Sequence, residues 1–213
     1  MCIIDQRSDD AMTSRIRITR LNDFAEMLSP EAAEDLMNSI QKGRYPRGTT
    51  LLSPGQTSEW LHFIEKGILR CYFFSEEADG TREVTSWISA EGEAGFSPQS
   101  FYRQTPATEY MEVLEDSVLF SLHYTQFYRL QREYPDYFGL VMKLTEESVI
   151  KHKERAQMLR FRSPRQRFQL FEEYHPQLRG RLSQKVIASY INVSYHEISR
   201  VRRKLTPIAN APF

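Results

Sequence analysis

The residues with the clearest chemical meaning lie near the C-terminus, where four cations fall within the five positions 200–204. The surrounding segment, 195–204, has the sequence YHEISRVRRK, and its apolar members Ile198 and Val201 are three residues apart. That spacing predicts a helix with one apolar stripe, which leaves the remaining side chains facing outward. Exposed arginines on a helix suit nucleic acid, because a guanidinium can bond to guanine edges and to phosphate oxygens.

The residues just before this helix predict a shorter helix and a tight turn. Ser183 can cap the shorter helix, and Ala188 is small enough for two helices to approach closely. Asn192 lies where the backbone must turn left-handed, a conformation that asparagine tolerates better than most residues. Ser194 and Glu197 have the spacing of a capping box at the start of the second helix. Together these features predict a helix-turn-helix.

In a helix-turn-helix, the N-terminal part of the second helix enters the major groove of duplex DNA. We therefore predict base contacts from Tyr195, His196, Ser199 and Arg200, and Arg200 is the strongest candidate because arginine can bond to two acceptors of one guanine. Phosphate contacts are predicted for the flanking polar and basic residues Arg181, Ser183, Lys185, Ser194, Arg202, Arg203 and Lys204. The alternative is a small helical subdomain with solvated charges, but the caps, the turn and the apolar stripe all hold the right spacing at once.

The distribution of charge supports this interpretation. The chain has 213 residues, with 28 Lys and Arg against 28 Asp and Glu. Residues 151–213 hold 14 basic and 4 acidic residues, whereas residues 1–150 hold 14 basic and 24 acidic residues. A basic C-terminal part beside an acidic, aromatic-rich body predicts a DNA-binding unit attached to a unit that controls it.

Several classes of function are disfavoured. No run of about 18 apolar residues occurs and no secretory signal is recognisable, so we expect no contact with a membrane. Cys2 and Cys71 form neither a metal cluster nor a disulfide framework, which favours a cytoplasmic protein. The sequence has no Gly-rich phosphate loop, no nucleophile elbow and no paired histidines, so we expect neither an enzyme nor a bound metal or cofactor.

The rest of the chain must position the C-terminal motif. Ser29 and Pro30 predict the start of a helix that ends at Gly43. From residue 45 to residue 122, short apolar runs alternate with turn residues, and Asp79-Gly80 is the clearest hairpin signal. This pattern predicts a small antiparallel barrel or sandwich.

Helical character returns after the β region. We predict one helix over 125–133, a longer one over about 136–159, and another that begins at Pro164. The longer helix is too polar along its later part to be buried on all sides, so one face is expected to contact a partner.

With these residues in view, the chain resembles the Crp/Fnr family of bacterial transcription regulators from about residue 21 to residue 205. The segment VIASYINVSYHEISRVRRKL is similar to the pattern YIASYLGIxxxxxSRIRRKL of Bacteroidetes-type members, and LEDS at 114–117 is typical of the same group. The turns at Pro54-Gly55 and Lys66-Gly67 match the β-roll turns of the family.

The resemblance implies an α+β fold: an N-terminal antiparallel β-roll of the cyclic-nucleotide-binding type with flanking helices, a long dimerisation helix, and a C-terminal wingless helix-turn-helix domain. The expected boundaries are a flexible arm at 1–20, the roll sensor domain at 21–134, the dimerisation helix at 135–161 and the DNA-binding domain at 162–213. The resemblance also implies a homodimer that binds a palindromic site in double-stranded DNA. The acidic roll is a candidate surface for RNA polymerase.

Three departures from the family pattern shape these expectations. Phe96 follows Gly95 where the family has Glu, and Ala107 and Thr108 stand where an Arg-Ser pair belongs. A cyclic phosphate needs a cation or several donors, so we expect no binding of cAMP. The cysteine cluster of oxygen-sensing members is absent, which argues against an iron–sulfur cluster. Only eight residues follow Leu205, and their two prolines disfavour a β-hairpin wing.

The effector, if the protein has one, is a different small molecule. An alternative function is therefore a small-molecule-binding β-roll sensor with weak or vestigial DNA binding. The aromatic residues that could line its apolar pocket are Trp87, Phe96, Phe101, Tyr102 and Tyr110. Aromatic residues also dominate protein cores, so burial in the core is the competing explanation.

Overall fold

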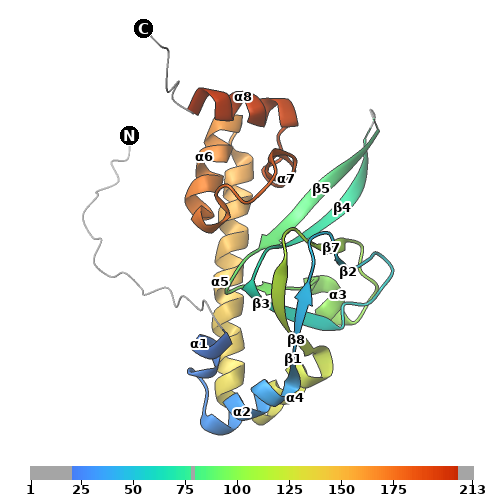
Figure 1. Ribbon diagram of the computed structural model, residues 1–213, viewed down its shortest axis with the longest axis vertical. Helices are drawn as coiled ribbons and strands as arrows, with labels where there is room; N and C mark the ends of the chain where they lie inside the picture. Colours follow the sequence, from blue (N-terminus) through green and yellow to red (C-terminus); the bar gives the residue numbers. More distant parts are fainter. Residues whose placement is uncertain (1–20, 78–79, 206–213) are drawn as a thin grey trace, which may run out of the picture.

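The computed structural model describes residues 21–77 and 80–205, apart from the side chains of Leu21, Asn22, Glu77, Lys204 and Leu205 (Figure 1). In chain order, the elements are α1 (Leu21–Ala25), α2 (Pro30–Ser39), β1 (Ile40–Tyr45), β2 (Thr50–Leu52), β3 (Trp60–Lys66), β4 (Leu69–Glu77), β5 (Gly80–Ser89), β6 (Ala94–Gly95), α3 (Pro98–Arg103), β7 (Tyr110–Val113), β8 (Ser117–His123), α4 (Tyr124–Glu133), α5 (Pro135–Arg160), α6 (Pro164–Tyr174), a 3₁₀ turn (Pro176–Leu178), α7 (Gln184–Tyr190) and α8 (Tyr195–Leu205).

Two four-stranded antiparallel sheets form the β-roll. One sheet has the strand order β1-β8-β3-β6, and the other has the order β2-β7-β4-β5. The predicted glycine turns are present: Gly55 has φ 88° and Gly67 has φ 112°. A Cβ atom at Gly67 would collide with the side chain of Ser117, so this turn requires glycine. The predicted α+β class with an antiparallel roll is confirmed.

Apolar side chains from both sheets fill the roll. Ile64, Leu69, Met111 and Leu119 are each at most 1% exposed. A second cluster closes the end of the roll where α1, α2 and α4 lie, and it contains Phe101, which is fully buried. These clusters make the roll a rigid body against which the helices pack.

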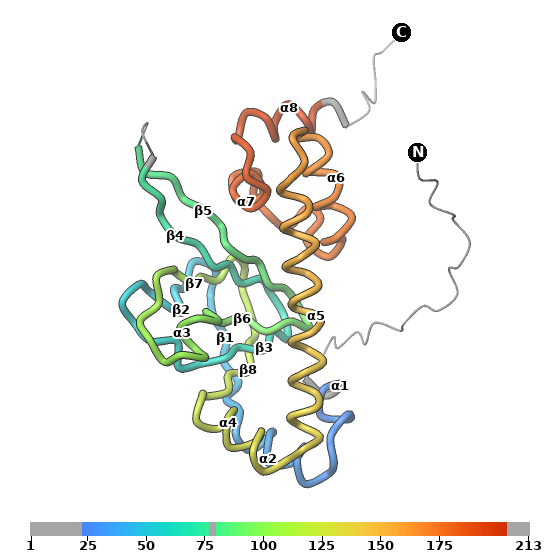
Figure 2. The backbone as a smooth tube through the Cα atoms, turned by 180° about the vertical axis from the view of Figure 1, so that it is seen from behind, coloured from blue at the N-terminus to red at the C-terminus, as the bar shows by residue number. Residues whose placement is uncertain are grey.

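The helix α5 links the roll to the C-terminal helices. Figures 1 and 2 show it running along most of the length of the molecule, with the strands on one side of its central part and α6 beside its far end. Leu140 buries its side chain near one end, and Met158 is fully buried near the other. Lys151 forms an ion pair with Glu93 of the roll, with 2.6 Å between Nζ and Oε1. The helix therefore has a face on the roll and an opposite face in solvent.

Most predicted helix boundaries are confirmed. The helix α2 begins at Pro30, as Ser29-Pro30 predicted. The helices α4 and α5 lie within two residues of the predicted ranges 125–133 and 136–159. The helix α6 begins at Pro164, and Ser163 Oγ accepts a hydrogen bond from the backbone N–H of Gln166 at 3.4 Å.

The prediction that the first helix ends at Gly43 is wrong. The helix α2 ends at Ser39, and Ile40 already has an extended backbone with ψ 151°. Gly43 lies inside β1, opposite Leu119 of β8. The apolar spacing up to Ile40 fits a helix, but pairing with a strand far along the chain decides the conformation of the next six residues.

Some expectations concern residues outside the described part of the chain. They are the flexible arm at 1–20, the absence of a wing after Leu205, and Asp79 in the predicted hairpin turn. The hairpin itself is present, because β4 and β5 pair antiparallel up to Glu77 and Gly80.

Candidate nucleic-acid interface

The helices α7 and α8 form the predicted helix-turn-helix. Asn192 has φ 53°, so it takes the left-handed conformation at the point where the sequence predicted it. The backbone N–H of Val193 donates to the carbonyl oxygen of Ala188 at 2.9 Å, which closes the turn. Ala188 is 3% exposed and lies in the cluster shared by α6, α7 and α8. A larger side chain there would push the helices apart.

Side-chain caps fix where each helix begins. Ser183 Oγ accepts a hydrogen bond from the N–H of Val186 at 3.2 Å. Ser194 Oγ accepts from the N–H of Glu197 at 3.2 Å, while Glu197 Oε2 accepts from the N–H of Ser194 at 2.8 Å. The hydrogen bonds from the backbone and side chain of Ser194 hold the pKa of Glu197 below its ordinary value. This reciprocal pair is the predicted capping box, and it fixes the start of α8.

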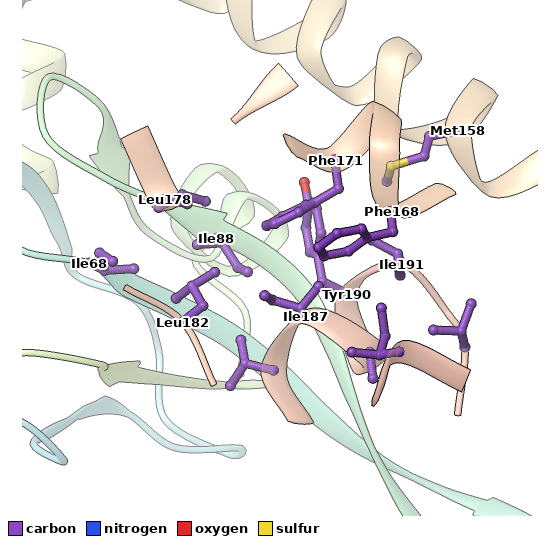
Figure 3. Packing of buried hydrophobic residues seen from close by; sticks show 14 of the residues in the cluster. Ile68, Ile88, Met158, Phe168, Phe171, Leu178, Leu182, Ile187, Tyr190 and Ile191 are labelled. Atoms are coloured by element: carbon purple, nitrogen blue, oxygen red, sulfur yellow. The ribbon is translucent and has the colours of Figure 1, made fainter. Parts of the chain in front are cut away.

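An apolar stripe holds α8 in place. Ile198 is fully buried, Val201 is half-buried, and both pack in the cluster that contains Phe168 and Phe171 of α6. Figure 3 shows Phe168, Phe171 and Ile191 gathered on the same side of this cluster. The rotation of α8 about its own axis is therefore set by packing.

The opposite face of α8 is open to solvent. The four predicted base-contacting residues, Tyr195, His196, Ser199 and Arg200, are all exposed, and Tyr195 retains 53% of its surface. Figure 1 shows α8 lying across one end of the molecule, next to no strand of the roll. The structure thus brings together all four side chains on one accessible surface.

The predicted phosphate-contacting residues are not equally available. Ser183, Ser194 and Arg203 are exposed, and Arg202 is half-buried. Lys185 is 73% exposed, and its Nζ lies 3.9 Å from Glu83 Oε2 of β5. For Lys204 the structure describes the backbone but not the side chain.

Arg181 differs from the other predicted phosphate contacts. Its guanidinium donates to both carboxylate oxygens of Glu91, at 2.9 and 2.6 Å, and also bonds to Glu115. Both carboxylates belong to the roll, and Arg181 is 28% exposed. In this conformation Arg181 is bound by the protein and is not presented to a phosphate, which the sequence alone did not indicate.

Sequence reasoning also missed a residue that supports the turn. Arg167 of α6 donates from Nη1 to the carbonyl oxygens of Ile191 and Asn192, at 3.2 and 2.6 Å. Its Nε donates to the carbonyl oxygen of Phe161 at 2.6 Å. The side chain therefore satisfies carbonyl groups at the turn, and no local sequence pattern distinguishes it from a surface cation.

The solvent face of α5 carries an apolar stripe. Phe138, Met142 and Val149 are 49%, 46% and 62% exposed, and their spacing of four and seven residues places them on one side of the helix. Gly139 is exposed near this stripe, and a Cβ atom there would meet nothing within 4 Å. An exposed apolar stripe next to a small residue is typical of a helix that packs against another helix.

No protein-family model matches the chain. The cAMP-dependent protein kinase regulatory subunit of Mucor circinelloides f. lusitanicus is 25% identical over 111 residues, which cover 52% of this chain and 24% of that protein. The match therefore spans about a quarter of the length of that relative.

Solved structures match over most of the chain. A protein described as a transcriptional regulator of the Crp/Fnr family from Eubacterium rectale has a TM-score of 0.64 at 15% identity, with 84% of each chain covered. CLP, the c-di-GMP-responsive global regulator of Xanthomonas campestris, has a TM-score of 0.63 at 18% identity, with 83% of this chain and 91% of that chain covered. The chain shares its fold with these two regulators. At these identities the likeness establishes the fold, whereas function must be argued from the site.

The five residues of the predicted aromatic pocket lie in three groups of ring contacts. Phe96, Phe101 and Tyr102 pack edge to face, with ring centroids 5.3–5.6 Å apart. Trp87 instead stacks on His152 of α5, with centroids 3.9 Å apart, and Tyr110 stacks on Tyr72 at 5.0 Å. Phe101 and Tyr102 lie in α3 and Phe96 lies just before it, whereas Trp87 lies in β5 and Tyr110 in β7.

The segment of the roll that departs from the family's nucleotide-binding pattern is occupied by internal contacts. Ala107 is 5% exposed, and it has no side-chain donor for a phosphate. Glu109 Oε1 accepts from Ser97 Oγ at 2.7 Å, and Glu109 Oε2 accepts from Ser86 Oγ at 2.6 Å. The hydroxyl groups of Ser86 and Ser97 are therefore already paired with a carboxylate, which would repel a phosphate.

Two hollows lie elsewhere on the roll. One, of about 700 Å³, is lined by Asp35, Asn38, Ser39, Gln41, Trp60, His123, Thr125, Gln126 and Arg129. The other, of about 380 Å³, is lined by Leu51, Leu52, Gln56, Thr57, Ser58, Glu59, Trp60, His62 and Met111. Neither of these two hollows is lined by a member of the predicted aromatic set, whose role stays a prediction.

The described residues contain no cluster of three or more His, Cys, Asp or Glu side chains that could hold a metal ion. Across residues 21–77 and 80–205, no helix is both long enough and apolar enough to cross a membrane.

Proposed function

We propose that the chain is a sequence-specific DNA-binding transcription regulator of the Crp/Fnr family, of the Bacteroidetes type. The observation that carries the proposal is the solvent face of α8. Tyr195, His196, Ser199 and Arg200 lie exposed on that face, while Ile198 on the opposite face is fully buried. An α-helix held in this way fits the major groove, and these side-chain types can read base edges there.

The proposed division of roles follows exposure for the side chains that the structure describes, and position in the sequence for Lys204. Arg200 and its three exposed neighbours contact bases, and Lys185, Arg202, Arg203 and Lys204 contact phosphates, with Ser183 and Ser194 supplying hydrogen bonds beside the caps. Arg181 is left out of the phosphate set because Glu91 and Glu115 bind it.

The protein acts as a homodimer on a palindromic site. The exposed stripe of Phe138, Met142 and Val149 on α5 provides the self-complementary surface that a two-fold axis requires. Pairing through α5 would present two copies of α8 to successive major grooves, roughly 34 Å apart on one side of the duplex. In this arrangement residues 21–134 form the roll, 135–161 the dimerisation helix and 162–213 the DNA-binding unit.

The roll does not bind cAMP. Ala107 and Thr108 provide no cation for a cyclic phosphate, and Glu109 already binds the hydroxyl groups of Ser86 and Ser97. A roll without a cyclic-nucleotide site is consistent with a regulator that responds to another molecule or to none. Contact of the acidic roll with RNA polymerase is an extension of the same proposal.

Selection of bound sequences from random DNA, with the purified protein alone, tests the function. The expected result is a palindromic consensus, whose two-fold symmetry would report the dimer as well as the specificity. Binding should weaken steeply with salt, because the cations of α8 displace counterions from phosphates. Recovery of no enriched sequence at low salt would refute the proposal.

A further inference from the structure

The edge of the second sheet is covered by α7. The strand β5 lies at that edge, so its outward N–H and C=O groups have no partner strand. Ser189 of α7 accepts from the N–H of Thr85 at 2.7 Å and donates to the carbonyl oxygen of Glu83 at 2.9 Å. Arg155 of α5 donates to the carbonyl oxygens of Thr85 and Tyr190, both at 3.1 Å. The first helix of the DNA-binding motif thus takes the place of a neighbouring strand.

A continuous apolar core lies beside these hydrogen bonds. Ile68 and Ile88 of the roll belong to the same buried cluster as Leu178, Leu182 and Ile187 of the C-terminal unit. Figure 3 shows these five side chains as neighbours within the cluster. The roll and the DNA-binding unit therefore share one core at this point, instead of meeting only through α5.

Arg181 joins the DNA-binding unit to the roll through ion pairs. Its guanidinium bonds to Glu91 and Glu115, which follow β5 and β7 respectively, and all three side chains are about one-third exposed or less. Glu91 also accepts from the N–H of Gly67 at 2.8 Å. Although partial burial alone would raise the pKa of Glu91, the bonds from Arg181 and Gly67 hold it below its ordinary value. The arginine therefore bonds to two segments of the roll at once.

None of these contacts covers the DNA-binding face. They involve α7, the segment before it and the turn, where Arg82 donates to Asn192 Oδ1 at 3.0 Å. Tyr195, Ser199 and Arg200 remain exposed. Figures 1 and 2 agree that the β4–β5 hairpin lies alongside α7 and leaves α8 free at the end of the molecule. The docked conformation is therefore one that can receive a duplex.

We infer that Arg181, Glu91 and Glu115 are positioning residues for DNA binding. They form a latch that fixes α7 on the roll and, through the packed turn, holds α8 in its DNA-binding orientation without a bound effector. This inference rests on the proposed function, and it assigns Arg181 a role different from direct contact with phosphate. It also makes β5 the part of the roll on which the DNA-binding unit docks.

The double variant Glu91→Gln/Glu115→Gln separates positioning from simple electrostatics. It removes two negative charges and frees Arg181, so charge alone would strengthen binding to DNA. If the latch positions α8, the same variant should weaken binding to the selected operator about tenfold, the size typical of coupling between sites. Glu31→Gln/Glu34→Gln is the matched control, because it makes the same charge change on the exposed surface of α2, at the opposite end of the molecule. Equal or tighter binding by the latch variant would overturn the inference.

Hydrogen exchange in the DNA-free protein provides a second test. The N–H of Thr85 points at Ser189, so its protection reports whether α7 is docked on β5. Arg181→Gln should accelerate exchange at Thr85 and across α7, whereas Arg179→Gln should not, because Arg179 pairs with Glu172 inside the C-terminal unit. Unchanged exchange at Thr85 in Arg181→Gln would refute the latch. Failure of the wild-type protein to bind any DNA would refute the proposed function and would leave this exchange test valid.

Discussion

Replacement of the apolar stripe on α5 should dissociate the proposed dimer. Met142 and Val149 are 46% and 62% exposed, so roughly half of each side chain is available for burial against a partner. Full burial of an aliphatic side chain contributes about 1.5–3 kcal/mol, and burial of the exposed half contributes about 1 kcal/mol. Two such residues on each protomer therefore contribute about 4 kcal/mol, which corresponds to about 1,000-fold in the dissociation constant.

The variant Met142→Glu/Val149→Glu removes this contribution and places four carboxylates in the interface. We expect a dimer in the wild-type protein and a monomer in the variant at micromolar concentration, measured by sedimentation velocity over a range of concentrations. DNA binding should then lose its dependence on the second half-site. The folded monomer should persist, because both side chains lie on the solvent face of α5 and outside the described clusters of buried residues.

Ser148→Glu is the control for a single added charge on α5. Ser148 is exposed on the same helix but lies about a third of a turn from the line through Met142 and Val149. It should leave the dissociation constant of the dimer nearly unchanged. A dimer that survives the double substitution, or that dissociates equally in Ser148→Glu, would show that the stripe is not the interface.

Three further outcomes are expected. Arg200→Ala should weaken binding to the operator by about 1–3 kcal/mol and relax the sequence preference at one base pair. Arg203→Ala should instead weaken binding to all duplexes alike and reduce the slope of log affinity against log salt by about one per protomer. Titrations on specific and random duplexes distinguish the two variants. Asn192→Val should lower the free energy of unfolding by about 1–2 kcal/mol, because a β-branched side chain must then adopt φ 53°. Asn192→Gly should lower it much less. Thermal melts at equal protein concentration compare the two variants. Burial lowers the pKa of His62 to about 4, so below about pH 6.5 the unfolded chain takes up a proton that the folded chain excludes. The free energy of unfolding should therefore fall by up to about 3 kcal/mol between pH 6.5 and pH 4. Denaturant titrations over this pH range should show a shallower fall in His62→Gln.

Much of the helix-turn-helix could be predicted from the sequence, because its determinants are local. Ser194 and Glu197 are three residues apart, and their reciprocal hydrogen bonds depend only on that spacing. Asn192 takes the left-handed turn because its own side chain tolerates it. The β4–β5 hairpin and the start of α2 follow from similarly short signals. Such features depend on residues within one turn of backbone, so one sequence is sufficient to locate them.

The features that the sequence did not reveal depend on distant partners. Gly43 lies in a strand because β8, more than 70 residues later, pairs with it. Arg181 has the neighbours of a phosphate contact in the sequence, but the fold places Glu91 and Glu115 against it. The aromatic residues from Trp87 to Tyr110 are close in sequence, yet strand alternation and α3 separate them. In each case tertiary packing decides the environment.

Contacts within the protein also reduce the number of cations in residues 151–213 that are available to bind phosphates. Of its 14 basic residues, at least five already bond to groups of the protein: Lys151, Arg155, Arg167, Arg179 and Arg181. A count of cations from the sequence therefore overstates the number available to phosphates. Because each phosphate contact contributes roughly 0.9 to the salt slope, the measured slope should correspond to the few cations on α7 and α8 and not to the whole segment. Among the five bonded cations, Arg167 satisfies carbonyl groups at the turn, and Arg181 holds the segment before α7 against the acidic roll.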